Sequence, residues 1–172
     1  MALTLVIGNK NYSSWSFRPW IAMKAAGIPF DEVVISLDAA DFKERVLKVS
    51  GTGKVPVLID GNVRVWESLA ILDYLADTFP EKAWWPKDPD AKAFARSAAA
   101  EMHAGFSTLR THMGFNARRD LKGLGRAPGV DADIARISAL WNEARAGFGA
   151  GASPRHARNS KRPSRPRASC WC

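Results

Sequence analysis

Hydrophobic and polar positions alternate in short blocks through the first 80 residues. Runs rich in Val, Ile and Leu predict strands, and stretches with apolar residues every three or four positions predict helices. Asp60-Gly61-Asn62 separates two strand-like runs and predicts a β-hairpin. The expected strands are 3–8, 30–37, 55–59 and 63–66, and the expected helices are 17–26, 41–49 and 68–78. For the first of these helices, Ser16 is the expected N-cap, Pro19 lies in the first turn and Gly27 is the stop.

The order of these elements is βαβαββα, which defines a fold class. A βαβ unit gives a parallel strand pair, and the hairpin that follows adds antiparallel strands. We therefore expect an α/β domain over residues 1–80, with a small mixed sheet and helices packed on it. Thioredoxin-like folds have this order of elements.

The second half of the chain is predicted to be all-helical. Residues 81–90 contain prolines and the Trp84-Trp85 pair and are interpreted as a linker. The domain expected at 91–150 holds one helix over about 91–119 and a second over 131–148. Side chains at helical spacing are the expected core, namely Met102, Phe106, Leu109 and Met113 in the first helix and Ile134, Ile137, Trp141 and Phe148 in the second.

The net charge of +8 comes mostly from the C-terminal tail. Residues 151–172 hold six Lys and Arg and no Asp or Glu, so 19 basic and 17 acidic residues remain in 1–150, a charge of +2. This distribution argues against nucleic-acid binding by the globular part. The tail has no apolar periodicity and is expected to be disordered. It is interpreted either as a frameshift product or as a native basic arm for nucleic acid or acidic membranes.

Other patterns exclude several classes of function. No apolar run is long enough to span a bilayer, and the N-terminus lacks the features of a signal peptide, so a cytoplasmic location is expected. Both cysteines lie in the tail, which excludes thiol catalysis by the globular part. Gly51-Thr52-Gly53-Lys54 lacks the first Gly and the Ser/Thr of a phosphate-binding loop. His103, His112 and His156 have no metal-ligand spacing, and no metal is expected.

Three short motifs occur in a specific order. They are the Ser13-Ser14 pair with Arg18 close behind, Val55-Pro56 before the third strand, and Glu67-Ser68 before the third helix. With these motifs the chain, from residue 2 to about 150, resembles the glutathione transferase family, and most closely its zeta class and related bacterial members. The resemblance implies glutathione as co-substrate, a small electrophile as the second substrate, and a homodimer.

The residues fit the chemistry of glutathione. Glu67 can pair with the γ-glutamyl ammonium, and Ser68 can hold the adjacent carboxylate at a helix N-terminus. The resemblance implies a cis Val55–Pro56 bond that exposes the Val55 backbone to the cysteinyl unit, as a short β-augmentation. From sequence alone, a strand-opening proline and a simple N-cap serine remain alternatives.

The resemblance assigns thiol activation to Ser13, with Ser14 as a second glutathione contact. A hydroxyl donor near the sulfur and a helix N-terminus would favour the thiolate. Ser14 and Tyr12 remain alternatives as thiol activator. Arg18 matches a family arginine and is either a contact for an anionic substrate or a solvated helix residue.

Three functions remain open at this point. The first is conjugation of glutathione to an electrophile, and the second is maleylacetoacetate-type cis-trans isomerisation. Trp15 stands where zeta enzymes usually have Cys, which counts against the isomerase. The third is a non-catalytic binding protein. Since the family continues with further helices, the helical domain is expected to be incomplete and turnover to be weak or absent.

Overall fold

A four-stranded mixed sheet forms the base of the molecule. In the computed structural model, which describes residues 2–149, the strands are β1 (Leu3–Ile7), β2 (Phe30–Val34), β3 (Val57–Asp60) and β4 (Val63–Trp66). The strand order is β2-β1-β3-β4. β1 pairs parallel with β2 and antiparallel with β3, and β3 pairs antiparallel with β4. The predicted mixed sheet and its βαβαββα order are confirmed.

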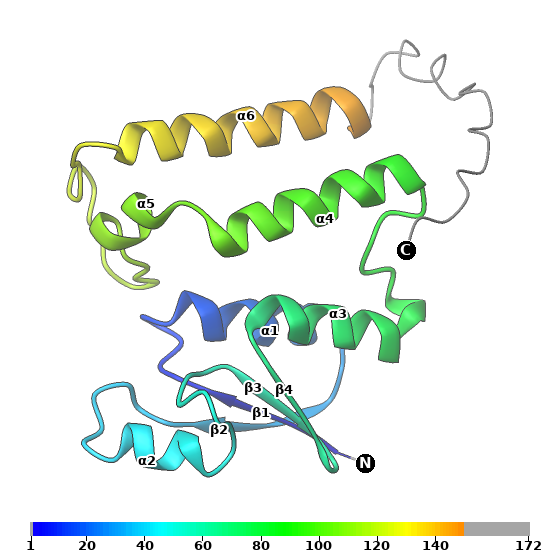
Figure 1. Ribbon diagram of the computed structural model, residues 1–172, viewed down its shortest axis with the longest axis vertical. Helices are drawn as coiled ribbons and strands as arrows, with labels where there is room; N and C mark the ends of the chain where they lie inside the picture. Colours follow the sequence, from blue (N-terminus) through cyan, green and yellow to red (C-terminus); the bar gives the residue numbers. More distant parts are fainter. Residues whose placement is uncertain (1, 150–172) are drawn as a thin grey trace, which may run out of the picture.

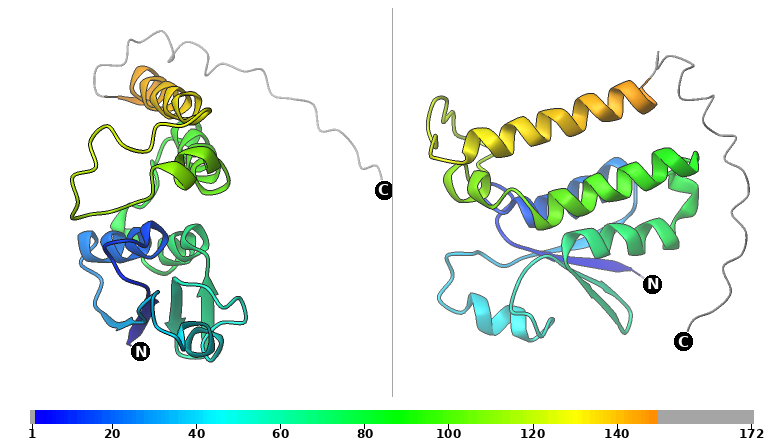
Figure 2. Two further views of the ribbon diagram at one scale, coloured as in Figure 1. Left: turned by 90° about the vertical axis from the view of Figure 1, so that its left-hand side faces the viewer. Right: turned by 45° about the horizontal axis from the view of Figure 1, so that its top comes forward.

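Helices cover both faces of the sheet, and the remaining helices form further layers (Figure 1). α1 (Ser14–Ala25) and α3 (Ser68–Thr78) lie on one face, and α2 (Phe42–Leu47) lies on the other. A 3-10 turn, η1 (Pro80–Lys82), leads to α4 (Pro89–Ala104), α5 (Ser107–His112) and α6 (Val130–Phe148). α4 packs against α3 and α6 packs against α4, so the layers succeed one another away from the sheet (Figure 2). The fold is thioredoxin-like with an all-helical C-terminal region.

The alternation of side chains along β1 produces two cores. Leu3, Leu5 and Ile7 point to the face covered by α1 and α3, because successive strand residues point to opposite sides. Val6 points to the other face, against Val46 of α2. The first core is completed by apolar residues of α1, α3, β3 and the connection between α1 and β2, namely Met23, Ile71, Leu75, Leu58 and Ile28.

The predicted start of α1 is wrong. The helix begins at Ser14, and its N-cap is Ser13, whose side chain accepts a hydrogen bond from the Ser16 amide. Ser16 lies inside the helix and is fully buried. Pro19 consequently lies past the first turn, and it is also fully buried.

The predicted helix over residues 91–119 is also wrong, because it breaks between α4 and α5. Gly105 ends α4 where a Cβ atom would lie 2.8 Å from the Glu101 carbonyl oxygen. Phe106, with φ of 61°, interrupts the helical backbone and is buried. The Arg110 side chain then donates to the carbonyl oxygens of Met102 and Gly105, which have no helical partners at the end of α4.

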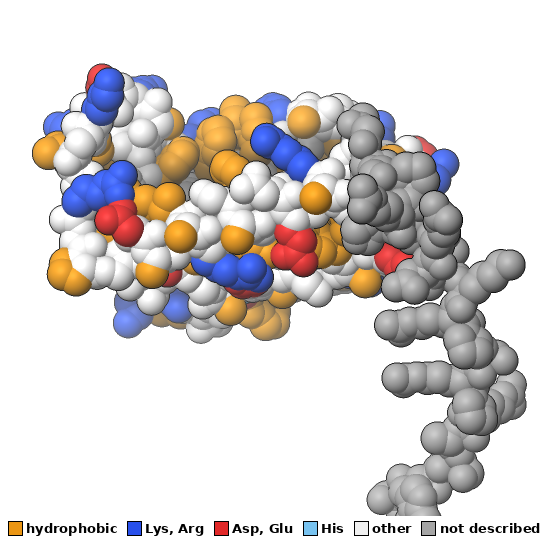
Figure 3. Space-filling view, turned by 90° about the horizontal axis from the view of Figure 1, so that it is seen from above, with side chains coloured by type: hydrophobic (Ala, Val, Ile, Leu, Met, Phe, Trp, Pro, Cys, Tyr) orange, Lys and Arg blue, Asp and Glu red, His pale blue; other side chains and the backbone are white. Residues whose placement is uncertain are grey.

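Other boundaries and exposures differ from the prediction. β2 ends at Val34, because the chain beyond it is held by Asn9, whose side-chain oxygen accepts from the Leu37 amide. β3 begins at Val57, so Val55 and Pro56 lie before the strand. Trp141, an expected core residue, is 63% exposed because α6 packs on one side only. Figure 3, a view onto the α6 side, shows hydrophobic side chains interspersed with charged ones.

Within residues 2–149, no helix is long and apolar enough to cross a membrane. The tail at 151–172, with both cysteines and His156, lies outside the described residues. Its two interpretations remain predictions.

Candidate functional site

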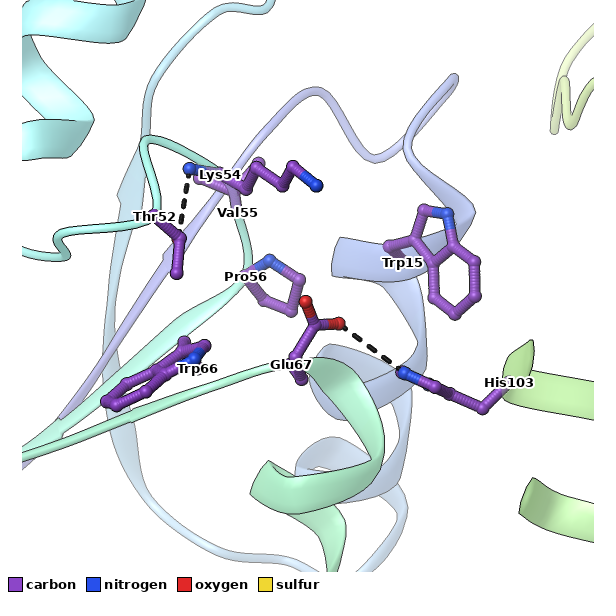
Figure 4. Close-up of a pocket in the computed structure, with 8 residues that line it drawn as sticks. All are labelled: Trp15, Thr52, Lys54, Val55, Pro56, Trp66, Glu67 and His103. Atoms are coloured by element: carbon purple, nitrogen blue, oxygen red, sulfur yellow. Dashed lines mark hydrogen bonds and ion pairs between the residues drawn. The ribbon is translucent and has the colours of Figure 1, made fainter.

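A cavity of about 230 Å³ opens between the sheet and the C-terminal end of α4 (Figure 4). Four segments line it: the start of α1, the loop before β3, the junction of β4 with α3, and the last turn of α4. Their lining residues are Trp15, Thr52, Lys54, Val55, Pro56, Trp66, Glu67 and His103. The cavity therefore combines an exposed backbone segment, one carboxylate, one ammonium group and aromatic rings.

Glu67 occupies the N-cap position of α3 in a strained conformation. Its φ of 68° lies in the left-handed region, which a residue with a Cβ atom adopts at a cost of about 1–3 kcal/mol. Its carbonyl still accepts the first bond of the helix, from the Ile71 amide at 3.0 Å. Strain of this kind occurs at ligand-binding positions, and here it accompanies a half-exposed carboxylate in the cavity. Ser68 follows directly as the first residue of α3 and is buried.

The loop before β3 carries the second polar group of the cavity. Thr52 and Ser50 hydrogen-bond through their hydroxyls at 3.0 Å, and the Lys54 amide donates to the Thr52 hydroxyl at 3.2 Å. The Val55–Pro56 bond that follows is cis. Lys54 lies at the cavity wall opposite Glu67, with Pro56 between them (Figure 4).

Lys54 was missed by sequence reasoning, which considered it only as part of a phosphate-binding loop. Its position directly before Val55-Pro56 was the available signal.

The serine pair is placed at the start of α1, but it does not line the cavity. Ser13 is buried, and its hydroxyl donates to the Ser16 hydroxyl at 3.0 Å. The Ser16 hydroxyl in turn accepts from the Gly8 amide at 3.1 Å, which ties α1 to the end of β1. Ser14 is partly exposed. Trp15, the next residue, is the one that reaches the cavity.

Trp15 is surrounded by cationic side chains. The guanidinium groups of Arg18 and Arg110 lie 4.3 Å and 4.6 Å from the centre of its ring. Such contacts are attractive because the face of an aromatic ring is electronegative. Burial and the neighbouring Arg110 charge both lower the pKa of Arg18. Within residues 2–149, no carboxylate pairs with the Arg18 guanidinium, so this side of the site is electropositive.

His103 was also missed, because the sequence analysis regarded it as an ordinary helix residue. Its Nε2 atom lies 3.6 Å from Oε2 of Glu67, and its ring packs edge-on against Trp15 with 5.2 Å between the ring centres. Lone histidines on helices are common, and no local motif distinguishes this one. Only the packing of α4 against α3 brings it to the cavity (Figure 4).

The structure thus brings some of the predicted residues together and separates others. Val55, Pro56 and Glu67 line the cavity, and Ser68 adjoins it. Ser13, Ser14 and Arg18 do not line the cavity. The two serines directly precede Trp15, and the Arg18 guanidinium lies over the Trp15 ring. The roles assigned to all of these residues remain predictions. In the part of the chain that the structure describes, no cluster of three or more His, Cys, Asp or Glu could hold a metal ion.

The N-terminal part of the chain is similar to a known family. Residues 12–78 match the family model described as the glutathione S-transferase N-terminal domain. Among curated proteins, the chain is 38% identical over 99 residues to a zeta-class glutathione S-transferase of Euphorbia esula, covering 57% of this chain and 44% of that protein. It is 32% identical over 101 residues to maleylacetoacetate isomerase of Rattus norvegicus, covering 57% and 47%.

A solved structure is similar as well. A glutathione transferase homologue from Burkholderia, crystallised with bound glutathione, is 25% identical with a TM-score of 0.55, covering 64% of this chain and 59% of that one. The chain spans less than half the length of the two curated relatives. The residues matched by the family model contain the Ser-Ser, Val-Pro and Glu-Ser motifs, and α6 lies beyond them.

Proposed function

From the match of residues 12–78 to the glutathione S-transferase N-terminal domain family, we propose that the chain binds glutathione in the cavity between Lys54, Pro56 and Glu67. The observation that carries the proposal is the convergence of three elements of the cavity. They are the backbone segment at Val55 and Pro56, an ammonium group on one side of it and a carboxylate on the other.

Each part of glutathione has a counterpart in this arrangement. The γ-glutamyl ammonium pairs with Glu67, and its carboxylate meets the free amides in the first turn of α3 at Ser68. The cysteinyl unit hydrogen-bonds to the Val55 backbone, which lies outside the strand ladder. The glycyl carboxylate pairs with Lys54. A zwitterionic peptide with a cation at one end and an anion at the other fits this distribution of charge.

The proposed reaction is attack of the glutathione thiolate on an electrophile. Only a few per cent of a free thiol is ionised at neutral pH, so the site must stabilise the thiolate. Ser13 is the proposed donor. Its hydroxyl donates to Ser16 in the structure, so activation requires that its proton turn toward the sulfur. The N-terminus of α1 adds a favourable dipole at the same place.

An isomerase is the second candidate, and one observation favours it. The Arg18 guanidinium has no carboxylate partner within residues 2–149 and lies on Trp15 at the cavity wall. An unpaired arginine there would attract an anionic substrate, and one similar protein is named maleylacetoacetate isomerase. Trp15 in place of a cysteine separates this chain from the zeta pattern, so conjugation is proposed as the primary activity.

Calorimetric titration with glutathione tests the binding site. Glu67→Gln and Lys54→Met should each raise Kd by roughly tenfold or more, because each removes a charge-assisted contact of about 1.5–3 kcal/mol. The matched controls are Glu44→Gln and Lys48→Met, which disrupt an exposed ion pair on α2 and should leave Kd unchanged. Unchanged affinity in both cavity variants would refute the site.

Turnover with a generic aromatic electrophile tests the thiol activator. Ser13→Ala should lower kcat, and Ser13→Thr should retain much of it, because threonine keeps both the hydroxyl and the N-cap. Equal rates for Ser13→Ala and the wild type would remove Ser13 from the mechanism. Glutathione binding without turnover in the wild type would instead favour the non-catalytic binding protein.

A further inference from the structure

We propose that the connection between α5 and α6 docks the protein on an anionic lipid surface. Residues 118–124 of this connection form the docking loop. It places two leucine side chains at the boundary of the lipid acyl chains and its cationic side chains against lipid phosphates. The inference goes beyond the proposed function and does not depend on glutathione binding.

The docking loop is tied to the body of the protein at both of its ends. Before it, the Ala117 amide donates to the Asn11 carbonyl oxygen at 3.1 Å. After it, Gly125 lies so close to the end of α5 that a Cβ atom there would collide with the His112 carbonyl oxygen. The left view of Figure 2 shows the yellow-green connection extending to one side of the helices. The loop therefore projects between two fixed ends, as do the compact surface loops that frequently carry function.

Two glycines present Leu124 at the tip of the loop. Gly123 and Gly125 both have φ of 80°, in the left-handed region that favours glycine, so the chain turns sharply on either side of Leu124. Leu124 is 64% exposed, and Leu121, whose carbonyl oxygen accepts from the Leu124 amide at 3.0 Å, is 41% exposed. Two neighbouring apolar side chains thus remain in contact with water, and burying them would be favourable.

Cationic side chains accompany the two leucines. Three of them are exposed and form no ion pair within residues 2–149, namely Arg118, Arg119 and Lys122. The loop has one carboxylate, that of Asp120, and it accepts a hydrogen bond from the Lys122 amide at 3.1 Å. Arg126, beyond the loop, is paired with Asp131. The docking loop therefore combines exposed apolar groups with an excess of positive charge.

This combination favours a bilayer over other partners. Lys and Arg side chains are attracted to an anionic leaflet, and apolar side chains beside them gain by leaving water for the acyl boundary. A nucleic acid would use the cations but not the leucines, and the loop has no aromatic residue on which a base could stack. Residues 118–124 are also few beside the roughly 20–30 residues that a stable protein interface uses on each side. Two weak signals of different kinds suit reversible membrane docking.

The contacts of the connection set which part of the protein would face the lipid. Asn11 belongs to the segment between β1 and α1. The Phe115 ring, shortly before the loop, lies with its centre 5.5 Å from that of Phe17 in α1. A protein docked through the loop would therefore hold the start of α1 close to the bilayer surface.

Sedimentation with vesicles tests the proposal on the full chain. Binding is expected to phosphatidylcholine vesicles that contain about 30% phosphatidylserine and not to phosphatidylcholine alone, and it should weaken as salt rises from about 0.1 M to about 0.5 M. Arg119→Gln should lower the partition coefficient roughly fivefold, and Leu124→Ser roughly fivefold or more. The matched controls are Lys48→Gln and Leu47→Ser, at a cation and a leucine exposed on α2, which should change it by less than about twofold.

A fluorescent label separates the docking loop from the basic residues 151–172, whose charge would also attract anionic vesicles. Leu124→Cys is labelled with an environment-sensitive dye in a chain that carries Cys170→Ser and Cys172→Ser, so that no other thiol reacts. The emission should shift to shorter wavelength when phosphatidylserine-containing vesicles are added, because position 124 enters an apolar environment. The same dye at Leu47→Cys should show no shift.

Three results would overturn the proposal. Equal sedimentation with the two kinds of vesicle, or none with either, removes the anionic lipid as the partner. Vesicle binding with an unshifted dye at position 124 assigns the binding to another part of the chain. Binding of duplex DNA that Arg119→Gln weakens and Leu124→Ser does not, without vesicle binding, makes the loop a nucleic-acid contact instead. None of these results bears on glutathione binding, so the proposed function is tested separately.

Discussion

Replacing Ser16 with alanine should destabilise the protein more than any other serine substitution at the start of α1. The Ser16 hydroxyl accepts from the Gly8 amide at 3.1 Å and from the Ser13 hydroxyl at 3.0 Å, and the residue is fully buried. Alanine leaves the Gly8 amide without a partner at the end of a buried strand. The Ser13 hydroxyl loses its acceptor, but it can rotate to another one.

The expected loss of stability follows from the Gly8 amide, which is left without a hydrogen-bond partner. A buried donor left without a partner costs about 1–3 kcal/mol, so the free energy of unfolding should fall by about 2 kcal/mol. With a urea m-value of about 2 kcal/mol/M, the midpoint of unfolding should fall by about 1 M at constant m. For a chain of this size the melting temperature should fall by about 4–8 °C.

Urea unfolding followed by far-UV circular dichroism measures this effect, with two comparison variants. Ser13→Ala removes an N-cap and should cost about 1 kcal/mol. Ser14→Ala, at a partly exposed residue whose side chain makes no hydrogen bond within residues 2–149, should change the stability by less than about 0.5 kcal/mol. Equal midpoints for Ser16→Ala and Ser14→Ala would refute the argument that Ser16 links α1 to β1.

Two further predictions concern stability and pH. The hydrogen bonds from Arg136 lower the pKa of Glu101 below 4.5, so this bridge between α4 and α6 contributes stability above pH 4.5 and loses it as the pH falls further. The stability difference between the wild type and Glu101→Gln should therefore shrink as the pH falls below 4.5, and a difference that does not change with pH would contradict this. The hydrogen bond to Asp60, at 2.8 Å, raises the pKa of Tyr74 above 10.0, so its contribution is present below pH 10 and is lost as the pH rises through the raised value. Tyr74→Phe should lower the free energy of unfolding by about 0.5–1 kcal/mol at pH 7 and by less at pH 11, and an equal loss at both values would refute the assignment.

Most of the fold could be predicted from local patterns. The bounds of α3, Ser68–Thr78, match the prediction because leucines at helical spacing follow Ser68, a residue type that is favoured at the start of a helix. The hairpin at Gly61 is also as predicted, since its φ of 54° suits glycine at a tight turn. The start of α1 could not be predicted in the same way, because Ser13, Ser14 and Ser16 are all acceptable caps. Contacts with the distant Gly8 amide decide among them.

The candidate site also has a part that short motifs predict and a part that only tertiary contacts place. Val55-Pro56 and Glu67-Ser68 are short motifs, so the sequence located the part of the cavity that adjoins the sheet. It did not locate His103, because nothing around that residue in the chain distinguishes it from other helix residues. The break at Gly105 and the packing of α4 on α3 set where the last turn of α4 lies.

By itself, the sequence determined the order of elements, the hairpin, the three short motifs and the separation of a nearly neutral body from a basic tail. These depend on side-chain periodicity and turn chemistry, which act over a few residues. The tertiary structure alone decided that Ser16 links α1 to β1, that Lys54 and Glu67 lie on opposite sides of Pro56, and that His103 meets Glu67. Those arrangements depend on contacts between segments far apart in the chain, and no local pattern encodes such contacts.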